Sequence, residues 1–267
     1  MSRPFDDDHT LYSMPPFFGG TAYPPPALRY ADTLSLTVAY ATDPEALARL
    51  LPPGFTLQRP ELLVSCINNR GVEWMGGSPY NLVAVNVPVR FEGARDRLDG
   101  VFGLAVWENK ATPITAGREM LGVPKVFAEI EPLREFPAGE TRSWSHYEGA
   151  RFLDIGLTGA RVADKDEIAL LQAGLARVNW FGWRYLPKVG EPGAAISEPV
   201  VCPQDFTVRE AWFGEAALAW LPPDWQRNPT QAHIVAGLAA LPNKGFVGAV
   251  MTRSETLLRA DLARVPC

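Results

Sequence analysis

The sequence predicts a mainly β protein with a closed antiparallel sheet and a few short helices. Short segments that alternate between apolar and polar residues, or are rich in β-branched and aromatic residues, recur along the chain with turn residues between them. The 25 prolines and 23 glycines among 267 residues suit many turns between short strands. This spacing favours a closed antiparallel architecture over alternating strand-helix-strand units.

The first 30 residues are expected to form an extended arm, followed by one domain over residues 31–267. Proline-rich and glycine-rich segments at 14–16, 18–20 and 24–26 deny the arm regular backbone hydrogen bonding. Its aromatic side chains need burial, either across the chain's own barrel or on another subunit. They are Tyr12, Phe17, Phe18 and Tyr23. Burial on another subunit would make the protein a homo-oligomer, which we expect.

The domain opens with an alternating segment at 34–40, which predicts a half-buried strand. Asp43 and Pro44 then provide the cap and first position of a short helix that ends before residues 52–54. Further strands are expected at 62–67, 82–89, 102–107, 126–130, 152–157, 206–212 and 246–251. A longer helix is expected from residue 164 to about 176, because apolar residues recur on one face.

Composition and charge restrict the class of protein. Apolar residues make up 47% of the chain and charged residues 21%, which is ordinary for a soluble globular protein. A net charge of -5 argues against nucleic acid as a partner. The N-terminal segment has no apolar core typical of a signal peptide, and no run of about 18 apolar residues predicts a membrane span. We therefore expect no membrane partner.

Cysteine and motif content points to a cytoplasmic protein without a metal or cofactor. The three cysteines, Cys66, Cys202 and Cys267, form no close pair and lack clustered histidines, so we expect a reducing compartment and no zinc site. The patterns typical of serine hydrolases, nucleotide triphosphatases and dinucleotide-binding enzymes are absent from the sequence.

Lys125 differs from the other lysines of the chain. The other four lie beside residues typical of turns or solvated faces, whereas Lys125 follows Gly122 and Pro124 and opens the apolar segment 126–130. A lysine at the start of a strand can extend its ammonium into water. If it is desolvated instead, the charged form is disfavoured, and the neutral amine can attack a ketone to give a protonated Schiff base.

The segment around this lysine resembles a known motif. Residues 117–119, Gly-Arg-Glu, followed by 122–125, Gly-Val-Pro-Lys, are similar to the Gly-Arg-Glu and Pro-Lys motif of the acetoacetate decarboxylase family. Segments 39–53, 78–89 and 205–214 resemble further landmarks in the same order, from about residue 33 to the C-terminal region. The resemblance implies a cone-like β-barrel in which Lys125 forms a Schiff base with a keto acid or ketone.

The sequence departs from this family at three positions. Val126 stands where the decarboxylases carry a second lysine, and Leu82 stands two residues after Tyr80, where they carry a glutamate. The arginine that binds the substrate carboxylate aligns near Thr33, although Arg29 lies four residues earlier. These departures put acetoacetate decarboxylation in doubt more than they do the carbonyl chemistry of the lysine.

The candidate site follows from the resemblance and from neighbouring residues. Trp107 and Glu108 end the preceding predicted strand, and we expect Glu108 to replace the missing glutamate. Arg118 and Glu119 are neighbours on a segment expected to be extended, so one of them should share the pocket and the other should be a structural ion partner. The candidate catalytic residues are Lys125, Arg118 and Glu119, and the candidate substrate-binding residues are Tyr80, Leu82, Trp107, Glu108 and Arg29.

The function that we predict is a Schiff-base lyase of the aldolase or dehydratase type, acting on a small keto acid or ketone. A β-keto acid decarboxylase is the alternative within the same chemistry. A non-catalytic barrel that binds a small ligand is the alternative from another class. The dense aromatic segments at 180–185 and 212–225 fit either a substrate pocket or packing in a core or between subunits.

Overall fold

The computed structural model describes residues 9–137 and 139–267, and strands dominate it. The strands are β1 (Thr10–Leu11), β2 (Thr21–Ala22), β3 (Leu28–Ala41), β4 (Phe55–Leu57), β5 (Glu61–Val72), β6 (Tyr80–Glu92), β7 (Arg97–Glu108), β8 (Lys125–Phe127), β9 (Glu129–Ile130), β10 (Arg134–Phe136), β11 (Glu140–Tyr147), β12 (Ala150–Val162), β13 (Arg177–Pro187), β14 (Ala194–Trp220) and β15 (Phe246–Leu258). The helices are α1 (Pro44–Ala48), α2 (Ala111–Leu121), α3 (Lys165–Leu175) and α4 (Ala232–Ala239), with 3₁₀ turns η1 (Pro16–Phe18), η2 (Glu73–Met75) and η3 (Ala260–Leu262).

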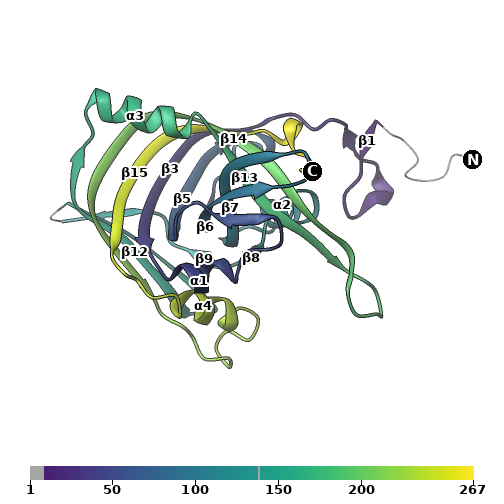
Figure 1. Ribbon diagram of the computed structural model, residues 1–267. Helices are drawn as coiled ribbons and strands as arrows, with labels where there is room; N and C mark the ends of the chain where they lie inside the picture. Colours follow the sequence, from purple (N-terminus) through teal and green to yellow (C-terminus); the bar gives the residue numbers. More distant parts are fainter. Residues whose placement is uncertain (1–8, 138) are drawn as a thin grey trace, which may run out of the picture.

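The main sheet closes on itself through its longest strand, β14. This strand pairs with β13 along its first part, with β15 along its middle and with β12 along its last part. The order β14-β13-β7-β6-β5-β3-β15 therefore forms a closed ring. Figure 1 shows its strands running between α3 at one end and α1 and α4 at the other. The predicted mainly β, closed sheet is confirmed.

The ring is not antiparallel throughout. β13 runs parallel to β7, with Trp180 opposite Val101 and Phe181 opposite Phe102. The short strand β8 is also parallel to β7. The long connections between these strands allow the chain to enter them from the same end, which a hairpin does not permit.

Side chains on the two faces of the ring have different surroundings. On β3, Leu36 and Val38 are fully buried in the main core, where they belong to the same cluster as Phe152 and Ile155 of β12. Their neighbour Ser35 points to the opposite face and lines a cavity inside the ring. One face of the ring therefore builds the core against the β11 and β12 layer, and the other face is available for a site.

The local helix signals are confirmed at α1 and α3. The Asp43 side chain accepts a hydrogen bond from the backbone N–H of Ala46 at 2.9 Å, with Pro44 at the first helical position. Asp164 and Glu167 form a reciprocal capping box at the start of α3.

The segment before Lys125 corrects an expectation. Residues 111–121 form helix α2, not an extended segment, so Arg118 and Glu119 lie on neighbouring positions of a helix. Pro113 stands in the first turn, where a missing N–H costs nothing, and Gly122 ends the helix with a φ of 64°. The strand expected at 126–130 is divided into β8 and β9, with Ala128 between them.

The described part of the N-terminal arm lies beside the ring and not across it (Figure 1). β1 and β2 pair with each other, and residues 1–8 lie outside the described residues. Phe18 and Tyr23 are 90% and 58% exposed, so the chain's own sheet does not bury them. Burial of these side chains on another subunit remains a prediction.

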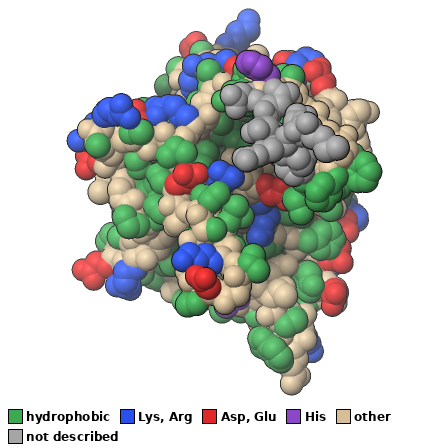
Figure 2. All heavy atoms as spheres, turned by 90° about the vertical axis from the view of Figure 1, so that its right-hand side faces the viewer, with side chains coloured by type: hydrophobic (Ala, Val, Ile, Leu, Met, Phe, Trp, Pro, Cys, Tyr) green, Lys and Arg blue, Asp and Glu red, His purple; other side chains and the backbone are tan. Residues whose placement is uncertain are grey.

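The surface carries charges of both signs. On the described part of the face in Figure 2, Lys and Arg side chains lie among Asp, Glu and hydrophobic ones and do not gather into one basic patch. None of the helices formed by the described residues has the length and apolar character that crossing a membrane requires.

Candidate active site

A cavity of about 320 Å³ occupies the inside of the ring. It is lined by side chains from β3, β5, β6, β7, β13, β14 and β15, together with residues of α2, the end of α3 and Lys125. Most of this lining is apolar or carries uncharged polar groups. The lysine that the sequence singled out therefore lies in the cavity and does not extend into bulk water.

The backbone around Lys125 directs its side chain inward. The chain leaves α2 at Gly122, and the backbone of Lys125 then pairs opposite Val106 at the start of β8. Its Nζ donates a hydrogen bond to the carbonyl oxygen of Pro113 at 2.8 Å, and the side chain is 13% exposed. The first turn of α2 thus holds the amine against the wall of the cavity.

Gly117 provides the space that the amine occupies. A Cβ atom added at this position would lie 2.6 Å from both Cε and Nζ of Lys125, which is closer than such atoms approach. The glycine of the Gly-Arg-Glu motif therefore has a steric role, because it leaves room for the Lys125 side chain to pack against α2.

We expect Gly117→Ala to move the amine without unfolding the protein, because the atoms in conflict are the flexible end of a side chain. The rate of imine formation should fall by about tenfold or more, since reacting groups lose rate steeply when displaced by an ångström. Gly174→Ala, in α3, where nothing lies within 4 Å of an added Cβ, is the matched control. Reductive trapping rates and thermal unfolding of both variants check the prediction. An unchanged rate in Gly117→Ala would contradict the steric role.

Glu108 is the charged partner of this lysine. Its Oε1 lies 2.9 Å from Nζ of Lys125, and its side chain is fully buried. Its Oε2 has no hydrogen-bond partner among the described residues. Burial raises the pKa of Glu108, and the neighbouring Lys125 opposes that increase. A carboxylate in this position can take a proton from the ammonium and return it to a reacting oxygen.

Arg118 and Glu119 lie near the lysine but outside the cavity lining. Nη1 of Arg118 donates a hydrogen bond to the backbone carbonyl of Lys125 at 2.7 Å, so its guanidinium holds the main chain of β8. Glu119 is exposed, and its backbone carbonyl accepts a hydrogen bond from Arg184 at 2.9 Å. Arg118 therefore holds the backbone of β8, the bond from Arg184 holds the end of α2 to β13, and neither Arg118 nor Glu119 lines the cavity.

Tyr80 and Leu82 line the cavity. Tyr80 is 4% exposed and hydrogen-bonds with Tyr30 and Asn69, and burial raises its pKa. Leu82 is paired directly with Glu108 across β6 and β7. The carboxyl group that this chain lacks at position 82 is therefore present one strand away, at the same level of the ring.

Trp107 and Arg29 do not reach the cavity. Trp107 precedes Glu108 on β7 and faces the main core, where its Nε1 donates to Gln231 at 2.8 Å. Arg29 forms ion pairs with Glu255 at 2.6 Å and Glu73 at 2.5 Å. Both arrangements leave these side chains outside the cavity lining.

The sequence analysis missed a group of hydroxyl side chains that lines one side of the cavity, which we call the hydroxyl wall. It comprises Thr33, Ser35 and Thr37 of β3, Ser65 of β5, and Thr252, Ser254 and Thr256 of β15. The signal was present as polar residues at every second position of two segments. Alternation alone does not show whether the polar face meets water or an internal cavity.

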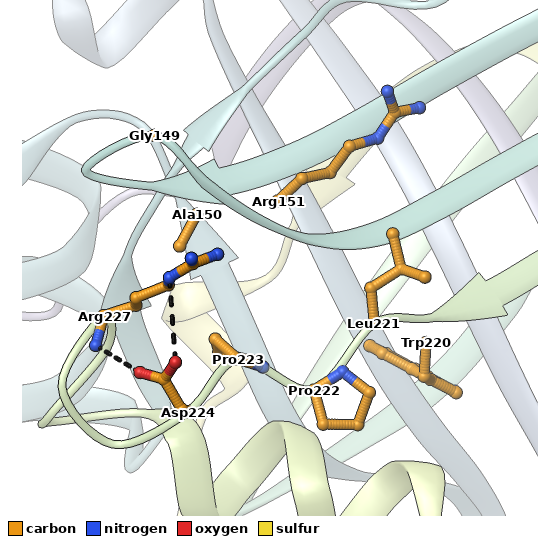
Figure 3. Close-up of a pocket in the computed structure, with 9 residues that line it drawn as sticks. All are labelled: Gly149, Ala150, Arg151, Trp220, Leu221, Pro222, Pro223, Asp224 and Arg227. Atoms are coloured by element: carbon orange, nitrogen blue, oxygen red, sulfur yellow. Dashed lines mark hydrogen bonds and ion pairs between the residues drawn. The ribbon is translucent and has the colours of Figure 1, made fainter.

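A second hollow lies at the surface between the β11–β12 turn and the segment after β14 (Figure 3). Arg227 and Asp224 form an ion pair across 3.6 Å at its edge, and their side chains are 74% and 62% exposed. The rest of its lining includes Pro222 and Pro223. It holds no lysine among its described residues, so the cavity inside the ring is the better candidate for carbonyl chemistry.

The chain is similar to known proteins in sequence and in fold. The family model described as acetoacetate decarboxylase matches residues 13–255. Acetoacetate decarboxylase 1 of Bradyrhizobium diazoefficiens is 27% identical over 259 residues, which cover 95% of this chain and 92% of the relative.

Solved structures share the fold. The acetoacetate decarboxylase of Legionella pneumophila has a TM-score of 0.74 at 20% identity, covering 99% of this chain and 94% of that one. The enduracididine biosynthesis enzyme MppR, complexed with the condensation product of pyruvate and imidazole 4-carboxaldehyde, has a TM-score of 0.73 at 19% identity, with 98% of both chains covered. At these identities the likeness concerns the fold.

Proposed function

The chain belongs to the acetoacetate decarboxylase family, and from this premise we propose that it is a lyase that forms a Schiff base between Lys125 and a carbonyl substrate. The family match and the curated relatives, which are named as enzymes, support a lysine-dependent lyase in general terms. The observation that carries the proposal is the ion pair of Lys125 with fully buried Glu108 in the cavity inside the ring.

Imine formation requires the ammonium of Lys125 to lose a proton. Oε1 of Glu108, 2.9 Å from Nζ, accepts that proton, and the freed lone pair attacks the carbonyl carbon. The addition leaves a positive charge on the nitrogen and a negative charge on the oxygen, and one proton moves from that nitrogen to that oxygen to give the neutral carbinolamine. The protonated Glu108 then gives its proton to the carbinolamine hydroxyl, the C–O bond breaks as the nitrogen lone pair forms the C=N bond, and water leaves. The product is a protonated imine beside the Glu108 carboxylate, so the pair begins and ends with no net charge.

The imine accepts an electron pair from a bond at the neighbouring carbon. We propose aldol cleavage or formation, or dehydration of a β-hydroxyketone, as the reaction, with Glu108 placed to move a proton at that carbon. Val126 supports this choice, because it does not provide the second lysine that the decarboxylases carry at this position. Decarboxylation of a β-keto acid is the second candidate, favoured by the names of the relatives.

Reductive trapping tests the proposal. The full-length protein, incubated with pyruvate, hydroxyacetone or 4-hydroxy-2-butanone and sodium cyanoborohydride, should gain one adduct that peptide mass spectrometry locates on Lys125. Lys110, Lys165, Lys188 and Lys244 are internal controls in the same sample. An adduct on one of these, or none with any of the three compounds, would contradict the lyase and favour a ligand-binding ring. Rapid CO₂ release from acetoacetate would favour the decarboxylase instead.

A further inference from the structure

The charge inside the cavity is balanced before any substrate enters. Among the described residues that line it, Lys125 and Glu108 are the only ones with a charged side chain, and they pair with each other. Formation of a protonated imine keeps the positive charge on the same nitrogen. A neutral substrate therefore leaves the cavity neutral at every stage, whereas a keto acid adds one negative charge.

The nearby arginines do not compensate for that charge. Arg29, four residues before the aligned position Thr33, is engaged with Glu73 and Glu255 outside the cavity lining. Arg118 is exposed and donates to the main chain of β8. Thr33 does line the cavity and is 4% exposed, and its hydroxyl donates a hydrogen bond to Oδ1 of Asn69 at 3.1 Å. A substrate carboxylate would thus meet no cation other than the imine itself.

The buried carboxylate of Glu108 makes this imbalance costly. Its side chain is fully buried, and Oε2 has no hydrogen-bond partner among the described residues, so the imine is its one source of compensation. A second carboxylate joined to the imine carbon skeleton would compete for the same positive charge at close range. Two buried anions sharing one cation are strongly disfavoured in a medium of low dielectric.

The hydroxyl wall suits neutral oxygen atoms. Thr256 has a buried hydroxyl oxygen with no hydrogen-bond partner in the described structure. On β15 it is preceded at alternate positions by Ser254 and Thr252, which pair with Thr33 and Ser35 of β3. Hydroxyl groups both donate and accept, so they can satisfy a ketone, ester or hydroxyl oxygen without supplying charge.

We propose that the substrate of this site is an uncharged carbonyl compound with at least one further neutral oxygen, such as a β-hydroxyketone, and not a keto acid. The inference rests on the proposed function, because it concerns the compound that reacts with Lys125. It narrows the substrate class that the sequence predicted, which included keto acids.

Pairs of an acid and its methyl ester, which share the same ketone and differ in charge and by one methyl group, test the inference. Methyl levulinate and levulinate share a ketone far from the charged group, and methyl pyruvate and pyruvate form a second pair. Each compound is trapped on Lys125 with cyanoborohydride. The rate of labelling of Lys125 is then divided by the rate at which the same compound labels Nα-acetyl-lysine, which corrects for its intrinsic reactivity. We expect the normalised labelling rate of each ester on Lys125 to exceed that of its acid by about tenfold or more. Equal or better labelling by the acids would overturn the inference, whereas no labelling by any compound would refute the proposed function.

The variant Glu108→Gln separates charge from cavity shape. With the carboxylate gone, the imine is left without a counter-ion, so the preference for ester over acid should disappear or reverse. Glu73→Gln, the same substitution on an exposed partner of Arg29, should keep the wild-type preference. The preference is the ratio of the ester and acid labelling rates within one variant, so it stays measurable when both rates are low. A preference in Glu108→Gln equal to that of the wild type would overturn the assignment to this carboxylate.

Discussion

Lys125→Met should abolish the trapped adduct and lower turnover of a β-hydroxyketone by roughly 10⁴-fold or more, because the covalent intermediate cannot form. No other lysine lines the cavity among the described residues, so none can replace the missing amine. Mass spectrometry after reductive trapping, together with a turnover assay, measures both effects. If the Lys125→Met variant kept its activity and were labelled at another lysine, the nucleophile would lie elsewhere.

The same substitution should also make stability depend on pH. Lys125→Met leaves Glu108 buried without its cation, and breaking a buried pair in this way costs about 3 to 5 kcal/mol if the carboxylate stays charged. Burial already raises the pKa of Glu108, and loss of Lys125 removes the opposing effect. The folded variant then holds a proton that the unfolded chain releases above pH of about 4.3, so its free energy of unfolding should fall as pH rises.

The double variant Lys125→Met, Glu108→Gln is the control for this effect. It has no buried carboxylate, so its stability relative to the wild type should change little between pH 5 and pH 8. Denaturant unfolding at several pH values compares the two variants. Parallel pH dependences in the single and double variants would contradict an unpaired carboxylate as the cause.

Local signals allowed much of the fold to be predicted, because strands and caps depend on neighbouring residues. Asp43 is an example, since its carboxylate accepts a hydrogen bond from the backbone N–H of Ala46, three residues later. Helix α2 was missed because Gly117 is a poor residue for a helix interior and a proline such as Pro113 suits only the first turn of a helix. Both are buried in the structure, so contacts distant in sequence stabilise a helix whose local propensity is low.

The site could be predicted only where a contact follows from sequence position or from the family motif. Lys125 was found by its motif. Glu108 was expected near the segment of Lys125, and the structure brings the two together because β8 pairs with β7 so that Val106 lies opposite Lys125. Which face a residue occupies was harder to predict, since Trp107 differs from Glu108 by one position and points into the core instead.

The face of β3 on which Arg29 lies could not be predicted, because this strand is irregular before Thr33. Thr33, Ser35 and Thr37 line the cavity, so strict alternation would place Arg29 there as well. Tyr30 lines the cavity too, which requires the alternation to change between residues 30 and 33. The pairing of β3 with β15 shifts register at this point, between Ser254 and Thr256. A bulge of this kind turns the preceding residues to the other face, and no local sequence signal marked it.

Glu108→Gln should lower the maximum rate of imine formation reached between pH 5 and pH 10. The amide cannot carry a proton to the departing oxygen, so the maximum rate should fall about 10² to 10⁴-fold.

The maximum rate identifies the role of Glu108, because a residue that acted only as a counter-ion would leave it unchanged. Trapping rates with methyl levulinate between pH 5 and pH 10 measure it, with Glu73→Gln as the matched control outside the cavity. A small carboxylic acid added to Glu108→Gln should restore part of the rate if it can enter the cavity of about 320 Å³. A maximum rate equal to that of the wild type would contradict proton transfer by Glu108 and leave it the role of balancing the charge of Lys125.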